Sequence, residues 1–202
     1  MKESDLALKF IEYFSEGYEV YKEVPVAGVI DMVVTDGTVK IGIEVKTKLS
    51  FKVIEQAFYK KPYLNYAYIA VPMGKDQGFA FYICRQLNIG VLLYNEKRNQ
   101  IVEEVKPTLN RNKSRVVLHE YMKESVAGSQ NQRVTAFGNT VNEIVKYLQR
   151  HDGATLEEVL HNVEYHWSNF SAAKASVYKW CANGVIKKFK VEKGKVYLNK
   201  EK

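Results

Sequence analysis

Two acidic residues and a lysine interrupt a pair of apolar, strand-like runs near the N-terminus. Asp31 lies within the run VIDMVV, and Glu44 and Lys46 lie within the next run, KIGIEVKT. Side chains alternate between the two faces of a strand, so Glu44 and Lys46 share one face while Ile43 and Val45 point to the other. One face of this hairpin is therefore expected to pack in a core, and the other to carry polar chemistry.

The turn between the two runs decides which side chains meet. Asp36-Gly37 between β-rich runs is a strong hairpin signal and predicts a two-residue loop. In that register Asp31 lies opposite Gly42 and diagonal to Glu44, at a Cα separation of roughly 7–8 Å. Gly42 has no side chain, so it is expected to leave room for an ion and its waters between the two carboxylates.

Two carboxylates beside a gap match the preference of Mg²⁺ or Mn²⁺ for oxygen ligands, which are typically one or two carboxylates, water and substrate phosphate. A lysine next to such an ion can hold or help deprotonate the attacking water, and it can neutralise charge in the transition state. Hydrolysis of a phosphodiester bond is the reaction that this set predicts. Lys48 projects from the same face and competes with Lys46 for the role.

The flanking patterns predict the elements that hold these residues. A helix begins near Ser4 and ends at Gly17, and a second begins at Ser50 and ends at Pro62. The remaining elements are strands at 18–24, 29–34, 39–47, 66–71 and 91–94, and a helix at 77–87. Antiparallel strands first and helix-crossover strands later predict an α/β fold, with a mixed β-sheet flanked by helices.

An Asp followed on the next strand by Glu44-Val45-Lys46, within a helix-then-three-strand unit, resembles the PD-(D/E)XK nuclease superfamily; Ile30 stands in place of the nominal proline. Members include Holliday-junction resolvases, Mrr-like restriction endonucleases and repair exonucleases. The resemblance covers residues 1–105 and implies a restriction-endonuclease-like αβββαβ core. It also implies that Asp31, Glu44 and the carbonyl of Val45 bind Mg²⁺ or Mn²⁺, and that Lys46 is catalytic.

The same resemblance implies further roles. An upstream acid often completes the site, and Glu12 on the first helix and Glu23 on the first strand are both candidates; Glu23 is favoured because it is closer in sequence to the hairpin. Gln56 resembles a glutamine that positions water or DNA beside the lysine. Lys52 and Lys60, on the same helix as Gln56, would line a path for the phosphate backbone. The alternative for Glu23 is an ordinary strand-edge carboxylate, and for the residues on helices it is a polar outer face.

The C-terminal part of the chain has a different pattern. Periodicity fades over residues 106–135, which we interpret as a connecting segment with a flexible stretch at 127–135. The sequence pattern of residues 136–202 predicts three helices and a β-hairpin that turns at Lys193-Gly194. This order of elements resembles that of a winged helix-turn-helix domain. A dimerisation or partner-binding module has the same outline. The resemblance implies DNA contacts from the third helix and the wing, namely from Asn169, Lys174, Lys179, Lys193 and Lys195.

Charge is distributed unevenly along the chain. Residues 1–105 carry 13 Lys and Arg against 14 Asp and Glu, whereas residues 106–202 carry 17 against 9. The basic excess of the second part favours binding to a polyanion such as nucleic acid, although a lysine-rich solvated surface has the same composition.

Several classes of protein are not supported by the sequence. The N-terminus MKESDLALKF lacks the apolar core of a signal peptide, and no apolar run approaches the roughly 18–20 residues of a membrane helix. Cys84 and Cys181 form no disulfide or zinc pattern, so a reducing cytoplasm is the expected location. The four histidines lie outside residues 1–105, and His161 and His166, five positions apart, are poorly spaced for two metal ligands on one helical face. No Gly-rich nucleotide loop occurs.

Together these observations predict a metal-dependent DNA endonuclease whose N-terminal domain hydrolyses duplex or branched DNA and whose C-terminal domain binds it. Cutting of both strands would favour two sites, which a homodimer would supply. The alternative is a non-catalytic DNA-binding or regulatory protein on a nuclease-like scaffold, in which the acidic pair is structural. That alternative predicts salt-sensitive DNA binding that needs neither metal nor Lys46.

Overall fold

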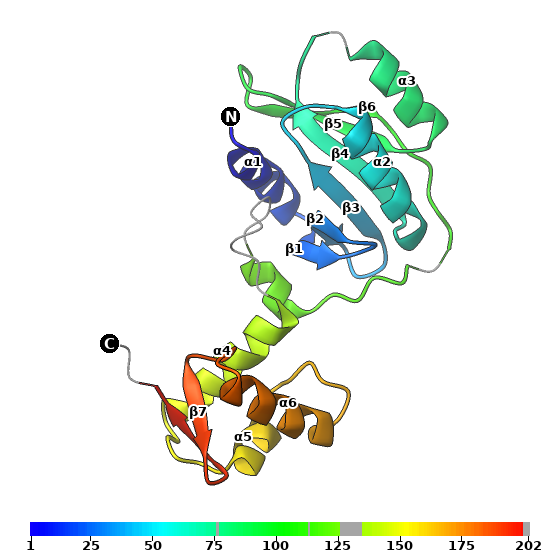
Figure 1. Cartoon of the computed structure of the whole chain (residues 1–202). Helices are drawn as coiled ribbons and strands as arrows, with labels where there is room; N and C mark the ends of the chain where they lie inside the picture. The colour runs from blue at the N-terminus through cyan, green and yellow to red at the C-terminus, as the bar shows by residue number, and fades with distance from the viewer. Residues whose placement is uncertain (76, 113, 126–134, 200–202) are drawn as a thin grey trace. The chain divides into compact units, whose positions relative to one another are not determined.

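The structure of the chain is a computed structural model, and it describes residues 1–75, 77–112, 114–125 and 135–199. Contacts divide the chain into two compact units, Met1–Arg133 (unit 1) and Val134–Lys202 (unit 2) (Figure 1). Each unit has its own buried apolar side chains, so each is described by itself.

The described residues of unit 1 form a six-stranded sheet, three α-helices and two short 3-10 helices. Its elements are α1 (Glu3–Ser15), β1 (Glu19–Pro25), β2 (Val29–Thr35), β3 (Lys40–Val45), α2 (Phe51–Lys60), η1 (Lys61–Tyr63), β4 (Tyr66–Pro72), α3 (Gly78–Gln86), β5 (Gly90–Asn95), β6 (Gln100–Val105) and η2 (Glu120–Glu124). The order of helices and strands up to β5 is the predicted one. The sequence pattern does not predict β6, because this edge strand is largely exposed and has no apolar run.

Local signals explain how two of the helices begin. Ser50 caps α2 as predicted, since its side chain accepts a hydrogen bond from the backbone N–H of Val53. The start predicted for α1 is wrong by two residues: Lys2 rather than Ser4 occupies the N-cap position, and the helix begins at Glu3.

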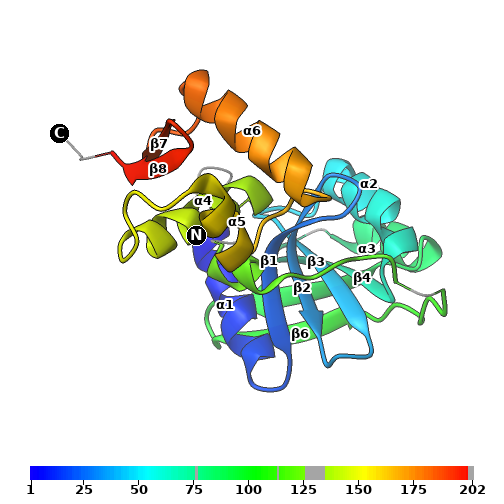
Figure 2. The same cartoon turned by 90° about the horizontal axis from the view of Figure 1, so that it is seen from below.

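The sheet is mixed, with strand order β1-β2-β3-β4-β5-β6. The first three strands are antiparallel, β3, β4 and β5 are parallel, and β6 returns antiparallel to β5. The helix α1 covers one face through Leu6 and Phe10, which pack with Ile43 and Val45. Helices α2 and α3 cover the other face (Figures 1 and 2). This arrangement confirms the α/β class with a mixed sheet flanked by helices.

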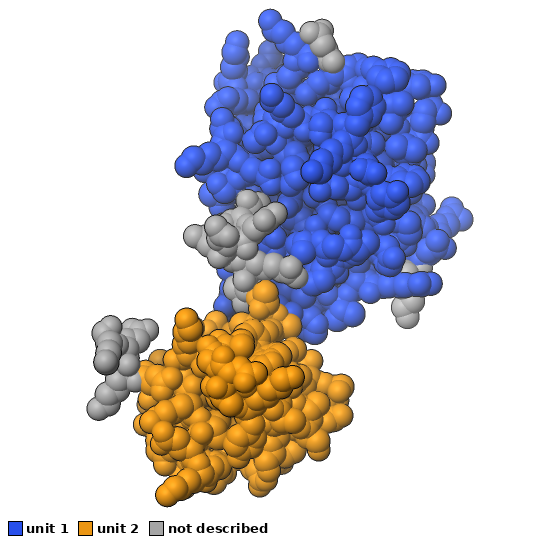
Figure 3. Space-filling view, in the orientation of Figure 1, with its two compact units in different colours: residues 1–133 blue, residues 134–202 orange. Residues whose placement is uncertain are grey.

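The interpretation of 106–135 as a connecting segment is wrong for its first part. Val116 and Met122 are buried in a cluster with Tyr21 and Leu64, and the Lys40 ammonium donates a hydrogen bond to the carbonyl of Val116 at 2.5 Å. The predicted flexible stretch lies outside the described residues, except for Thr135. Residues up to 125 therefore belong to unit 1 (Figure 3).

This packing changes the distribution of charge between the units. Unit 1 carries 19 Lys and Arg against 16 Asp and Glu, and unit 2 carries 11 against 7. Half of the basic excess of residues 106–202 thus lies in residues 106–133, which belong to unit 1. Both units are mildly basic, rather than only the C-terminal one.

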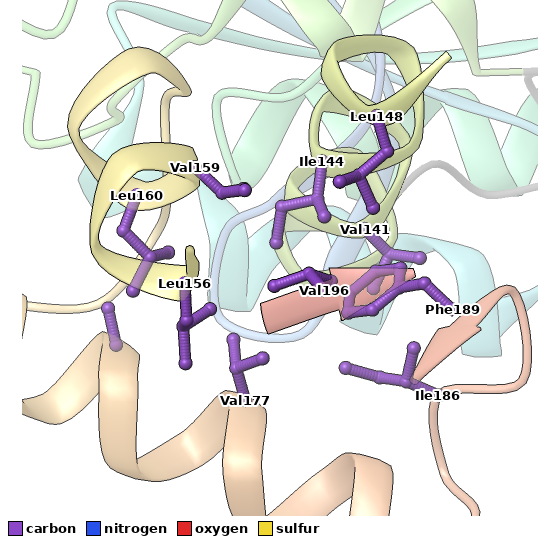
Figure 4. Packing of buried hydrophobic residues seen from close by; sticks show 11 residues of the cluster. Val141, Ile144, Leu148, Leu156, Val159, Leu160, Val177, Ile186, Phe189 and Val196 are labelled. Atoms are coloured by element: carbon purple, nitrogen blue, oxygen red, sulfur yellow. The ribbon is translucent and has the colours of Figure 1, made fainter. Parts of the chain in front are cut away.

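Unit 2 contains α4 (Ala136–Leu148), α5 (Leu156–Asn162), α6 (Phe170–Ala182), β7 (Phe189–Glu192) and β8 (Lys195–Leu198). Apolar side chains from all three helices and both strands form one core, which Figure 4 shows from close by. Beside it the rings of Trp167 and Trp180 lie 5.5 Å apart. Glu192 pairs with Lys195, so the predicted turn at Lys193-Gly194 is confirmed. No helix in the described part of the chain is both long and apolar enough to cross a bilayer.

Candidate active site

The register of the β2–β3 hairpin differs from the predicted one. Met32 pairs with Ile43 and Thr35 with Lys40, so the loop has four residues, 36–39, instead of two. The Asp36 carboxylate explains the longer loop, because its Oδ1 accepts the backbone N–H groups of Thr38 and Val39 at 2.9 and 2.8 Å. The shift is even, so the paired residues Met32–Thr35 and Lys40–Ile43 keep their predicted faces. The pairing ends at Met32 and Ile43, the residues next to Asp31 and Glu44.

Gly42 does not leave room for an ion, contrary to the prediction. It pairs with Val33, and a Cβ atom at this position would lie 2.3 Å from Leu64 Cδ1 and 2.6 Å from Ile30 Cδ1. Both side chains are fully buried. Gly42 is therefore needed for close packing beneath η1 rather than for an ion.

We expect Gly42→Ala to destabilise unit 1 by about 1–3 kcal/mol, because the added methyl group must displace two packed side chains. Urea unfolding of the full chain measures the change. Gly17→Ala is the matched control, since nothing lies within 4 Å of its added Cβ and its φ angle is not strained. Equal stability of the two variants would contradict this account of Gly42.

Lys46 is held by three oxygen atoms. Its Nζ lies 2.8 Å from Asp31 Oδ2, 2.7 Å from Glu3 Oε1 and 2.9 Å from the carbonyl oxygen of Val45. Asp31 Oδ2 also accepts the backbone N–H of Val45 at 2.8 Å, which ties the end of β3 to β2. Burial lowers the pKa of Lys46, but the carboxylates of Asp31 and Glu3 outweigh it and leave the pKa above its ordinary value. Lys46 is therefore an ammonium ion at neutral pH.

Glu44 is paired with a different lysine. Its Oε1 accepts a hydrogen bond from Nζ of Lys60 on α2, and the same ammonium donates to the carbonyl of Val29. Both side chains are almost fully buried. Burial, followed by the negative charge of Asp31, raises the pKa of Glu44 to about 7, although Lys60 and Lys46 act in the opposite direction.

This result corrects the role predicted for Lys60. A lysine that is 5% exposed cannot line a surface path for a phosphate backbone. Lys60 instead belongs to the candidate site as the buried partner of Glu44. Lys52, at the exposed beginning of α2, remains accessible to a ligand. Gln56 is half-buried one helical turn before Lys60, on the same side of α2.

The acidic residue contributed by α1 is Glu3, whose Oε1 contacts the Lys46 ammonium. Glu12 lies in an exposed pair with Lys9, at an Nζ to Oε2 distance of 3.5 Å. Glu23 is buried on β1 and has a positive φ of 53°. Its flanking pairs, Lys22 with Met32 and Val24 with Ile30, set it level with Asp31. The first-turn position of Glu3 carries no sequence signal of its contact with Lys46.

The oxygen donors of the site suit a hard divalent cation. Asp31 Oδ2 and the Val45 carbonyl both lie within hydrogen-bonding distance of one ammonium ion. The negative charge of Asp31 raises the pKa of Glu44, so a cation between these carboxylates would relieve their repulsion. Among the described residues, no three acidic, histidine or cysteine side chains together form a metal-binding group. Mg²⁺ needs only one or two carboxylates, because water and phosphate complete its shell.

The residues predicted to bind DNA in unit 2 have different environments. Lys179 is exposed on α6, and Lys193 and Lys195 are exposed at the tip of the β7–β8 hairpin. Lys174 is ion-paired with Glu157 of α5 at 2.6 Å. The Asn169 carboxamide caps α6, since its Oδ1 accepts the backbone N–H of Ala172 at 2.9 Å.

We expect Asn169→Ala to lower the stability of unit 2 by about 1 kcal/mol, because the first turn of α6 loses its cap. Asn169→Asp keeps an accepting oxygen and should leave stability nearly unchanged. Thermal unfolding followed by circular dichroism measures both. If Asn169→Asp is as unstable as Asn169→Ala, the capping role is wrong.

Comparisons with known proteins give no family for this chain. No protein-family model, no curated protein and no solved structure matches it.

Proposed function

We propose that the chain is a metal-dependent DNA endonuclease that hydrolyses phosphodiester bonds at the carboxyl end of β3. The observation that carries the proposal is the convergence of Glu3, Asp31 and the Val45 carbonyl on the Lys46 ammonium, next to buried Glu44. Acidic side chains, a carbonyl and a lysine at one strand end are the groups that phosphodiester hydrolysis uses. Under this proposal, the sheet of unit 1 is a restriction-endonuclease-like core.

The residues have separate roles in this proposal. Asp31, Glu44 and the Val45 carbonyl would hold Mg²⁺ or Mn²⁺, which supplies an activated water and a positive charge for the phosphate. Lys60 contacts Oε1 of Glu44, so Oε2 is the oxygen that can bind a cation without displacing Lys60. Lys46, as an ammonium ion fixed by Asp31 and Glu3, would stabilise the negative charge that develops on the phosphate oxygens.

Unit 2 would bind the DNA. Three helices followed by a hairpin, with Lys179 on the third helix and Lys193 and Lys195 at the tip of the hairpin, support a winged-helix-like role for it. Lys52 in unit 1 would add a contact to the backbone. Asn169 is not needed as a base contact, because it caps α6.

Supercoiled plasmid and a branched four-way junction test this function. We expect nicking in Mg²⁺ and in Mn²⁺, and none in EDTA. Asp31→Asn, purified in parallel, controls for a contaminating nuclease. If the protein binds both DNA forms but cuts neither of them in either metal, the endonuclease proposal fails.

One observation favours a second function. Both carboxylates of the hairpin are already engaged by lysines of the chain, Asp31 by Lys46 and Glu44 by Lys60. A site whose charges neutralise each other would be structural in a non-catalytic DNA-binding protein. In that case binding would weaken with added salt and would not change when Lys46 is replaced or metal is removed.

A further inference from the structure

Three exposed aromatic side chains lie on α2 and α3, with Phe79 next to both Phe51 and Tyr82. Phe51, Phe79 and Tyr82 are 67%, 65% and 53% exposed. The ring centroids of Phe51 and Phe79 are 6.4 Å apart in an edge-to-face arrangement, and those of Phe79 and Tyr82 are 6.4 Å apart with nearly parallel planes. Contiguous exposed apolar patches can mark binding sites. We call these three residues the aromatic platform.

The topology places the aromatic platform at the edge of the sheet that carries the candidate active site. β3 and β4 are parallel, so their carboxyl ends meet at one edge, and the chain passes from these ends into α2 and α3. Lys46 directly follows β3, and Phe51, the first residue of α2, is five positions further along. Figure 1 shows α2 and α3 on the same face of the sheet.

The charges around the platform indicate a polyanionic ligand. Residues 45–86 contain seven Lys and Arg against two Asp and Glu, and three of the seven, Lys46, Lys60 and Arg85, are ion-paired. Lys48, Lys52 and Lys75 in this stretch are exposed, and none forms an ion pair with a described residue. Lysines beside exposed rings suit a ligand that has both phosphates and flat apolar faces.

We propose that the aromatic platform stacks unpaired bases of single-stranded DNA while Lys48, Lys52 and Lys75 contact its phosphates. Paired bases in a duplex present only their edges to a protein, whereas unpaired bases can lie flat on aromatic rings. This inference deepens the proposed nuclease function, on which it rests: the substrate has a single-stranded segment next to the scissile bond, as in a flap or a splayed junction.

Fluorescence anisotropy of labelled oligothymidylate, in EDTA so that nothing is cut, tests the platform. We expect Phe79→Ala, and Phe51→Ala, each to weaken single-strand binding on the order of 5- to 100-fold, as loss of one stacked base predicts. Phe79→Tyr should retain most of the affinity. Binding to a blunt duplex of the same length should change less than about twofold, because no base can stack there.

Tyr13→Ala is the matched control, since Tyr13 is 52% exposed but lies on α1, which covers the opposite face of the sheet. The proposal is overturned if single-strand affinity is unchanged in Phe79→Ala, or if the duplex and the Tyr13→Ala control are affected equally. It is also overturned if the wild type sediments as a dimer that Phe79→Ala dissociates without loss of single-strand affinity, because the platform is then an interface between copies.

The two proposals fail in different ways. Loss of single-strand binding in the platform variants, with no cutting by the wild type in Mg²⁺ or Mn²⁺, supports the platform and contradicts the nuclease. Metal-dependent cutting by the wild type with unchanged binding by the platform variants supports the nuclease and contradicts the platform.

Discussion

Lys46→Ala should reduce the rate of DNA cleavage by at least about 100-fold, which is the usual cost of removing one charge-stabilising group from an active site. The variant keeps Asp31, Glu3 and the Val45 carbonyl and removes only the ammonium group that these oxygens hold in place. Single-turnover cleavage of a labelled substrate in Mg²⁺ measures the effect without contributions from product release. DNA affinity in EDTA should change only a few-fold, because Lys46 is one charge among many.

Lys48→Ala separates this role from general positive charge. Lys48 is two positions further along, is exposed, and forms no ion pair with a described residue. Lys48→Ala should therefore lower the cleavage rate far less than Lys46→Ala does. A larger loss in Lys48→Ala than in Lys46→Ala would transfer the catalytic role to Lys48, the competitor suggested by the sequence.

Lys60→Met should destabilise unit 1 by about 3–5 kcal/mol near pH 8, because it leaves the Glu44 carboxylate buried without its partner. Amide hydrogen exchange of peptides from β3 and β4 measures the loss, and peptides from unit 2 in the same sample provide the control. The double variant Lys60→Met/Glu44→Gln removes both charges. It should be more stable than either single variant, and additive losses would contradict the pairing.

The stability loss caused by Lys60→Met should also depend on pH in a defined direction. The pKa of Glu44 is raised from its ordinary value of 4.5 to about 7, so between these values the folded protein binds more protons than the unfolded one. The contribution of Glu44 to the stability of the folded protein is therefore most favourable below pH 4.5 and is lost as the pH rises through about 7. Removal of Lys60 should raise this pKa further. The stability loss of Lys60→Met should accordingly be smaller near pH 5 than near pH 8.

The sequence predicts the apolar face of β3 correctly, since Ile43 and Val45 pack in the core, even though it predicts the register wrongly. Asp36 lengthens the loop by two residues, and a shift of two preserves the alternation of faces. The polar and apolar sides of β3 follow from the strand period alone. The loop determines which residues of the two strands lie opposite each other. The sequence does not distinguish the four-residue loop that Asp36 stabilises from a two-residue Asp-Gly turn.

Residues that join the site from other elements were harder to predict. Lys60 is buried on α2 because it pairs with Glu44 on β3, and lysines are rarely buried without such a partner. Glu3 contacts Lys46 because of how α1 crosses the sheet, which no local pattern encodes. Residues 106–125 have little periodicity because they pack on unit 1 through a few separate side chains rather than through a regular element.

Both tryptophans of the chain, Trp167 and Trp180, lie in unit 2. Their intrinsic emission therefore reports on that unit alone, without any label, while the fourteen tyrosines are spread over both units. A DNA titration followed by tryptophan emission registers engagement of the predicted DNA-binding unit directly. The same signal, recorded during denaturation, gives the unfolding transition of unit 2 in variants whose substitutions lie in unit 1.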